Sequence, residues 1–184
     1  MMSMEKQAAK RHYLLRKLKY EKIFATSLGG ALAIALLAFL SHDQSFLIPP
    51  FGASCVIALV IPDSAYAKAR SIVGGHFLAS LVGLMVFSLG GGAWWCYGLA
   101  VGLAMLVMQL TRTLHPPAAA DPVLILEQGP LDWSFLIFPI LVGTMILVLF
   151  AASYRRYFLP QRTKERNKQV FLTNEGNKSK INKV

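Results

Sequence analysis

Charged residues are missing from long stretches of this chain. Only 15% of its 184 residues are Asp, Glu, Lys or Arg, whereas a soluble domain has about 25%. The uncharged stretches are residues 23–40, 44–62, 71–111 and 133–154, and a helix needs about 20 apolar residues to cross a bilayer. Together with 55% hydrophobic residues, this pattern excludes a soluble globular domain. It predicts an all-α polytopic membrane protein whose surroundings are a lipid bilayer.

Acidic residues and cysteines are also scarce. Nine acidic residues stand against 19 Lys and Arg, so the formal net charge is +10. Seven basic residues lie within residues 1–22 and nine within residues 155–184. Because basic residues beside spans mark the cytoplasmic side of a membrane, we expect both termini in the cytoplasm and no nucleic-acid partner. The two cysteines, Cys55 and Cys96, lie in apolar segments, which excludes a disulfide framework.

The chain contains two similar halves. Residues 48–59 align with residues 115–126 without a gap, at an offset of 67 positions. The two Pro-Pro pairs coincide, and so do Ala53 with Ala120, Val56 with Val123 and Leu59 with Leu126. Each half reads as a long helix, a short helix and a long helix, and three crossings per half would turn the second half upside down. The sequence therefore predicts an inverted repeat of two three-helix units. Chance similarity between apolar segments is the open alternative.

Each half has a short helix that opens with two prolines. Proline lacks an N–H group and suits only the first turn of a helix, so Pro49-Pro50 and Pro116-Pro117 mark two helix starts. The two helices run to about residues 61 and 126, and about 11 residues span about 16 Å, half of a bilayer. Extended backbone at that depth is tolerated only inside protein or beside a polar cavity. We therefore expect two half-helices that begin near mid-membrane.

These features divide the chain into four parts: a basic cytoplasmic N-terminal arm (1–22), membrane repeat 1 (23–89), an inverted membrane repeat 2 (90–154) and a basic cytoplasmic tail (155–184). Counting the short helices as crossings gives six spans. That topology places the basic residues of the loops inside, namely Lys68, Arg70 and Arg112, and three acidic residues outside, namely Asp43, Glu127 and Asp132. Four spans with two re-entrant loops are the alternative topology.

Small residues recur at four-residue spacing on the long helices. Gly75, Ala79 and Gly83 form one such row, and Gly98 and Gly102 form another. Rows of this kind let membrane helices approach closely, so we expect both to be packing residues. A small bundle with several such faces is also expected to form a homodimer.

Several separated motifs carry a family resemblance. They are Phe51-Gly52-Ala53-Ser54, Pro62-Asp63-Ser64, Gly74-Gly75-His76 and Thr111-x-Thr113-Leu114-His115-Pro116-Pro117. In this order and spacing the chain resembles the HPP family of integral membrane proteins over about residues 20–155. Members are known from bacteria, algae and plastids, and some have been implicated in nitrite transport. The resemblance thus implies a transporter in a bacterial inner (plasma) membrane. Ala118-Ala119-Ala120 stands where many relatives have a glycine after His-Pro-Pro.

The two half-helices predict an anion site. The first N–H groups of a helix have no partner within it and carry the positive end of the helix dipole, so two facing helix starts can bind a small anion. The predicted substrate-binding residues are Phe51, Gly52, Ala53, Ser54, His115, Ala118, Ala119, Ala120 and Asp121. Gly52 is expected to permit close backbone approach, and Ser54 to donate a hydrogen bond.

Three titratable side chains are candidates for proton coupling: Asp121, His76 and His115. A structural role is open for each of them. Asp121 suits a helix start, where it could pair N–H groups; His115 could bond backbone near the helix break; and His76 could bond between helices. An ionised Asp121 would repel an anion, so either protonation precedes binding or this side chain points away.

Several functions remain open. The first is a transporter or channel for a small inorganic anion, with nitrite favoured by the resemblance. The others are an aquaporin-like pore for a small neutral solute, a non-transporting assembly or sensing subunit, and an intramembrane enzyme with a metal at His76, His115 and Asp121. The spacing of those three residues matches no metal signature. We therefore expect no enzyme, no metal and no cofactor.

Overall fold

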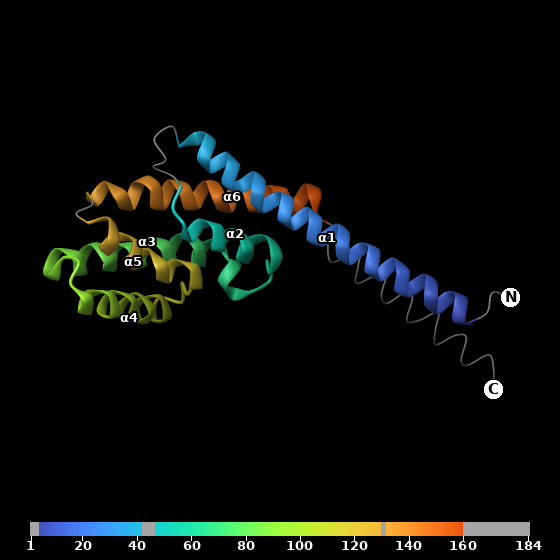
Figure 1. Cartoon of the computed structure of the whole chain (residues 1–184), viewed down its shortest axis with the longest axis horizontal. Helices are drawn as coiled ribbons and strands as arrows, with labels where there is room; N and C mark the ends of the chain where they lie inside the picture. Colours follow the sequence, from blue (N-terminus) through green and yellow to red (C-terminus); the bar gives the residue numbers. More distant parts are fainter. Residues whose placement is uncertain (1–3, 42–46, 130–131, 160–184) are drawn as a thin grey trace. The chain divides into compact units, whose positions relative to one another are not determined.

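The computed structural model of this protein describes residues 4–41, 47–129 and 132–159. Within those residues all regular structure is helical (Figure 1). The chain divides into two compact units, one made of Met1–Ala25 with Ser153–Val184 and the other of Thr26–Ala152. The second unit contains every candidate residue of the predicted substrate site.

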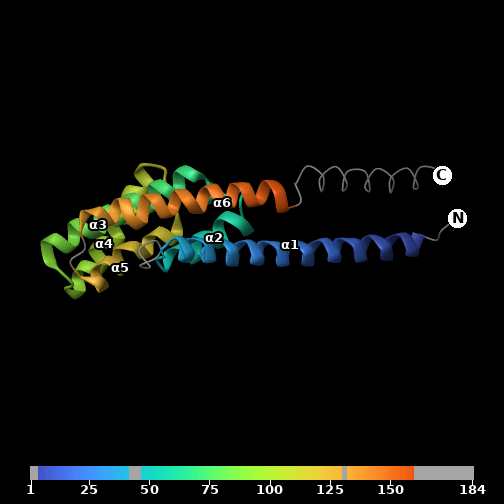
Figure 2. The same ribbon diagram turned by 90° about the horizontal axis from the view of Figure 1, so that it is seen from above.

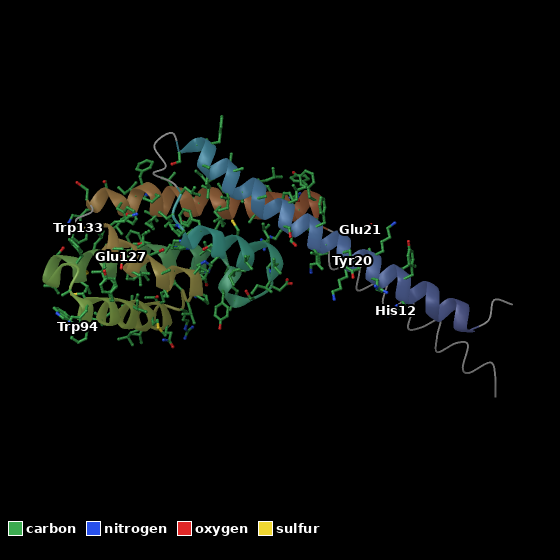
Figure 3. All side chains as sticks on the ribbon, in the orientation of Figure 1. His12, Tyr20, Glu21, Trp94, Glu127 and Trp133 are labelled. Carbon is green, nitrogen blue, oxygen red and sulfur yellow. The ribbon has the colours of Figure 1, made fainter. Side chains whose placement is uncertain are left out.

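The unit at the two ends of the chain contains a helical N-terminus rather than an irregular arm. Helix α1 (Met4–Leu40) runs unbroken through residues 4–22 and into the first apolar segment, and Figure 3 shows His12, Tyr20 and Glu21 along it. No glycine or proline precedes Gly29 in this helix, and such residues are what break helices. Within the same unit, Tyr154 Oη donates to the Ala25 carbonyl at 2.8 Å. Most of the predicted tail, residues 160–184, lies outside the described residues.

The larger unit contains the elements that position the site. They are α2 (Pro50–Val60), η1 (Ala65–Ala67), α3 (Ala69–Gly90), α4 (Trp94–Leu110), η2 (Pro116–Ala120), α5 (Asp121–Gln128), η3 (Trp133–Leu136), η4 (Ile137–Leu141) and α6 (Val142–Phe158). Both Pro-Pro pairs open short helical segments. Among the described residues three segments are long and apolar enough to cross a membrane: His12–Leu40, Ala69–Gly90 and Trp133–Phe158. The inverted repeat and the choice between six and four spans stay predictions.

The last predicted span is not one continuous helix. A 3₁₀ turn and a five-residue π-type segment precede α6, and Phe138 inside them has extended backbone angles (φ −120°, ψ 115°). Proline disfavours helical angles in the residue before it and removes a backbone hydrogen bond. Pro139 therefore interrupts the helix expected within the last uncharged stretch, residues 133–154.

Helix α3 is the centre of the larger unit. It contacts α4, α5, η1, η2, η3 and η4, and Figures 1 and 2 both show α4 and α5 beside it. The apolar core between α3, α4 and η2 is built from small and flexible side chains. Ala79, Ala104, Met108 and Ala118 are fully buried in it. Small side chains allow the close helix approach that membrane bundles rely on.

The packing prediction for glycines is confirmed on α3, whereas on α4 no packing partner lies within the described residues of this chain. A Cβ on Gly83 would lie 2.9 Å from Pro122 Cα, and a Cβ on Gly75 would lie 2.8 Å from His115 Cβ. A Cβ on Gly98 or Gly102, by contrast, would meet no atom within 4 Å. The row on α4 therefore faces away from the core that α4 forms with α3.

Aromatic and basic residues gather at different ends of the α3–α4 hairpin. Figure 3 shows Trp94, Glu127 and Trp133 at the end where α4 begins. Where α4 ends, Arg70 donates from Nη2 to the carbonyl of Arg112 at 2.6 Å. This segregation follows the predicted pattern of acidic and basic loops, although Asp43 lies outside the described residues and the orientation of the chain stays a prediction.

Replacing Gly83 by Ala tests the contact between α3 and α5. The added methyl group would press on backbone and Ile125 at about 3 Å, and overpacking of this kind costs about 1–3 kcal/mol. Gly98→Ala is the matched control, because open space surrounds it and Ala favours helix by up to about 1 kcal/mol. Thermal unfolding in detergent should show a lower Tm for Gly83→Ala alone. Equal Tm values for the two variants would contradict the packing described above.

Candidate functional site

Four polar side chains form one hydrogen-bonded chain inside the larger unit. Asp121 Oδ2 lies 2.7 Å from His76 Nδ1, and His76 Nε2 lies 2.8 Å from Ser54 Oγ. Ser54 Oγ lies 2.9 Å from His115 Nε2, and His115 Nδ1 lies 2.8 Å from the carbonyl oxygen of Tyr66. We call Asp121, His76, Ser54 and His115 the polar chain. It joins α2, α3, α5 and the segment before η2.

Ser54 is set by the start of α2. Pro50 occupies the first turn of the helix, and Ser54 lies one turn later, where its hydroxyl is 3.1 Å from the Pro50 carbonyl. A serine bonded to the carbonyl four residues back is a common arrangement within helices. The same hydroxyl oxygen also lies within hydrogen-bond distance of two imidazole rings, so three neighbours surround a group that has a single hydrogen.

The two histidines meet because a glycine lies between their backbones. His76 follows Gly75 on α3, and the space where Gly75 lacks a side chain is filled by His115 Cβ and the Thr113 carbonyl, 2.8 and 2.9 Å from the ideal Cβ position. His115 itself has extended backbone (φ −137°, ψ 101°), as expected for a residue that precedes proline. The ring centroids of His76 and His115 are then 5.1 Å apart.

Asp121 does not cap its own helix. It stands at the first position of α5, where the helix start makes no side-chain cap bond. Its Oδ2 instead accepts from Ser80 Oγ at 3.2 Å and contacts His76. Its other oxygen, Oδ1, is buried and has no hydrogen-bond partner. The capping interpretation is therefore wrong, and the carboxyl group belongs to the polar chain.

The polar chain is closed off from its surroundings. Ser54, His76, His115, Asp121 and Ser80 each have 0% of their surface exposed. The ring of Phe51, also fully buried, packs edge-on against His76 with centroids 5.3 Å apart. Polar side chains at membrane depth are expensive unless they are paired with one another, and they mark functional sites.

Four N–H groups of the predicted backbone anion site are paired within the chain. The N–H groups of Phe51 and Gly52 donate to the carbonyls of Ile48 and Pro49 at 3.0 and 3.1 Å. The N–H of Ala118 donates to the His115 carbonyl at 3.0 Å, and that of Asp121 donates to the Ala118 carbonyl. The expectation of free N–H groups is wrong at these four positions, because 3₁₀-type turns at the helix starts pair them.

The structure brings some of the predicted site residues together and leaves others out. Phe51, Ser54, His76, His115 and Asp121 meet in one place. Gly52, Ala53 and Ala120 are exposed, Ala119 is half-buried and Ala118 belongs to the apolar core. Gly52 has no protein atom within 4 Å of its Cβ position, so the close approach of a substrate to this glycine stays a prediction.

Sequence reasoning missed two partners of the polar chain. Ser80 lies four residues after His76, and residues at that spacing share one face of a helix; that spacing was the available signal. The Tyr66 carbonyl lies in η1, a turn that no sequence pattern linked to His115. Within residues 4–41, 47–129 and 132–159, no three His, Cys, Asp or Glu side chains have the arrangement of a metal site.

This arrangement can move or hold protons. Each member of the polar chain can both give and take a hydrogen in one of its protonation states, and the contacts are all within hydrogen-bond distance. Asp121, His76 and Ser54 also follow the order in which serine hydrolases arrange their catalytic groups. The second imidazole on the same hydroxyl is the feature that the hydrolase arrangement lacks.

Comparison with known proteins gives this geometry a context. Residues 15–165 match a family model described as HPP, transmembrane region. The chain is 35% identical over 136 residues to a transmembrane protein of Dictyostelium discoideum, covering 68% of this chain and 47% of that protein. A second transmembrane protein of the same organism is 28% identical over 137 residues, which are 68% of this chain and 44% of that protein. The chain thus spans about half the length of these curated relatives. No solved structure matches it.

The pairing of His76 with Asp121 predicts strong coupling between two substitutions. His76→Leu leaves the Asp121 carboxyl with Ser80 as its donor, and breaking a buried pair costs about 3–5 kcal/mol. The double variant His76→Leu/Asp121→Leu removes both partners, so its loss of unfolding free energy should be smaller than the sum of the single losses. Unfolding in detergent measures all three. Additive losses would contradict the contact.

Ser88→Ala is the matched control on the same helix. Its hydroxyl bonds only the Leu84 carbonyl of its own helix, at 2.9 Å. The loss should stay below about 1.5 kcal/mol.

Proposed function

The chain belongs to the HPP family of transmembrane proteins, and on that premise we propose that it is a membrane transporter for a small inorganic anion. Nitrite is the anion that the family resemblance favours. The observation that carries the proposal is the buried polar chain in an otherwise apolar bundle, since such groups at membrane depth are retained for ion or proton pathways. The proposal places the chain in a bacterial inner membrane, with both termini on the cytoplasmic side.

The two imidazole rings supply the place for the anion. His76 Nε2 and His115 Nε2 converge on one point, the Ser54 hydroxyl oxygen, at 2.8 and 2.9 Å. When both nitrogens carry hydrogen, they form a pair of donors aimed at a single acceptor oxygen. An oxygen of a small anion fits that requirement when it takes the place of the Ser54 hydroxyl oxygen, which occupies this point in the structure. Side chains here take over the role that backbone N–H groups were expected to have.

The relation between the two halves of the chain supports a transporter over an incidental polar cluster. At the offset of 67 positions Ser54 corresponds to Asp121, and both bond to His76. Sites in inverted-repeat transporters lie between interrupted helices of the two repeats. The fully buried state of the polar chain fits a carrier that opens to each side in turn better than a permanently open pore for neutral solutes. The open face of α4 at Gly98 and Gly102 leaves room for a second copy of the chain.

A second candidate is an intramembrane serine hydrolase, because Asp121, His76 and Ser54 follow the triad order. A fluorophosphonate reagent distinguishes it. Labelling of the purified protein that Ser54→Ala abolishes would favour the hydrolase. An unlabelled Ser54, together with transport, would remove this candidate.

Uptake of nitrite into proteoliposomes tests the transporter. Nitrous acid leaks through lipid, so empty liposomes set the background. We expect protein-dependent uptake that His115→Gln reduces to background, because glutamine cannot become a charged donor. His12→Gln is the matched control, since His12 is an exposed residue of α1. A folded wild-type protein with no uptake of nitrite, nitrate or formate above background would overturn the proposal.

A further inference from the structure

One hydrogen of the polar chain can be placed from its acceptor, and it lies on His115. Its Nδ1 is 2.8 Å from the Tyr66 carbonyl oxygen, and a carbonyl oxygen can only accept. Nδ1 of His115 therefore carries a hydrogen. A neutral His115 then has a bare Nε2 that must accept from Ser54, and a His115 whose Nε2 donates to Ser54 is positively charged.

The single hydrogen of Ser54 sets the number of protons on the rest of the chain. Suppose that Asp121 is ionised and both imidazoles are neutral. His76 then donates from Nδ1 to Asp121 and His115 donates to Tyr66, so both Nε2 atoms are bare. One hydroxyl hydrogen cannot serve two acceptors, and a buried nitrogen without a hydrogen-bond partner is destabilising. Full pairing of the three side-chain contacts therefore requires one proton more.

That additional proton leaves the polar chain with no net charge. It can lie between Asp121 and His76, with Ser54 donating to His115. It can also lie on His115, with Ser54 donating to His76 and Asp121 ionised. Shifting each hydrogen along its bond converts one arrangement into the other without changing the total charge. The polar chain is thus a relay for one proton.

The unpaired oxygen of Asp121 favours the first arrangement. Asp121 Oδ1 is buried without a partner, and an unpaired oxygen costs less on a neutral acid than on a carboxylate. The carboxyl group is a neutral acid when the hydrogen between Oδ2 and His76 Nδ1 lies on Oδ2. Ser80 still donates to Oδ2 at 3.2 Å in that state.

A second proton fits only if an anion comes with it. With both Nε2 atoms protonated, Ser54 accepts from both rings and turns its own hydrogen to the Pro50 carbonyl, 3.1 Å away. Every contact is again paired, but the polar chain now has a charge of +1. A net charge in a dry, fully buried site is costly unless an opposite charge neutralises it. An anion that entered without the second proton would give the site a charge of −1, which is equally costly.

We propose that this site takes up one proton with each monovalent anion, so that transport is electroneutral. The inference rests on the proposed function and adds its coupling. Among the residues that the structure describes, no other charged side chain is buried with the polar chain: Arg70, Arg112 and Glu127 are exposed, as is Tyr66. Cys55 on α2 is buried, and a thiol is a weak donor that is neutral in its ordinary state.

Initial rates of nitrite uptake at two membrane voltages test the coupling. Proteoliposomes with valinomycin are compared without a K⁺ gradient and with a tenfold gradient, at equal pH on both sides and then with an acidic outside. One proton per anion predicts a rate that the voltage leaves unchanged, a faster rate with the acidic outside, and acidification of the lumen. Anion conduction alone predicts a voltage-dependent rate, since each charge moved responds to the potential.

The proton count can also be measured without transport. The heat of nitrite binding to the detergent-solubilised protein, compared between buffers of different ionisation enthalpy, gives the protons taken up per anion. We expect one for the wild type. His115→Gln should bind no nitrite, and His12→Gln should match the wild type.

The outcomes separate this inference from the proposed function. Uptake that follows the voltage, or binding without proton uptake, overturns the coupling and leaves an anion transporter. Absence of both uptake and binding in folded wild-type protein overturns the proposed function and the coupling with it.

Discussion

The hydroxyl group of Ser54 has one hydrogen and three neighbours that compete for it. The Pro50 carbonyl, His76 Nε2 and His115 Nε2 all lie within 3.1 Å of its oxygen. In water the competition would be unimportant, because solvent would pair whatever the hydroxyl left free. In a fully buried site it ties the protonation of one imidazole to that of the other. The hydrogens of the polar chain are therefore shared among its members, and the properties of the site belong to the four residues together rather than to one of them.

The fold supplies this arrangement mainly through residues that have little side chain or no N–H group. Pro50 starts α2 so that Ser54 falls one turn into it, and Pro116 holds His115 extended before η2. Gly75 lets the backbone at His115 approach α3 closely enough for the two rings to share one hydroxyl. Because α3 contacts α4, α5 and η2, its position fixes the site and the apolar core together.

The sequence predicted the helical class, both Pro-Pro helix starts and most members of the site, since hydropathy, proline and polar residues at membrane depth act locally. It did not predict which polar atoms meet, because Ser54 and His115 are 61 residues apart and their contact depends on packing. It also assumed that helix starts leave N–H groups free, whereas tight turns pair them. Pro139 was overlooked inside an apolar run, where composition outweighed the one residue that breaks the helix.

The carboxyl group of Asp121 appeared at first to conflict with an anionic substrate, because two negative charges in a low-dielectric site repel each other strongly. The geometry removes the conflict without moving the side chain away. Asp121 contacts His76 at 2.7 Å. In both one-proton arrangements proposed above, the carboxyl group is either neutral or balanced by an imidazolium ion of the polar chain, so the proposed substrate would meet a neutral site. A neutral resting site also explains how such groups can remain buried in a membrane bundle. In the proposed transporter, charge enters the site only when a proton and an anion arrive together. This requirement couples the uptake of the proton to the uptake of the anion.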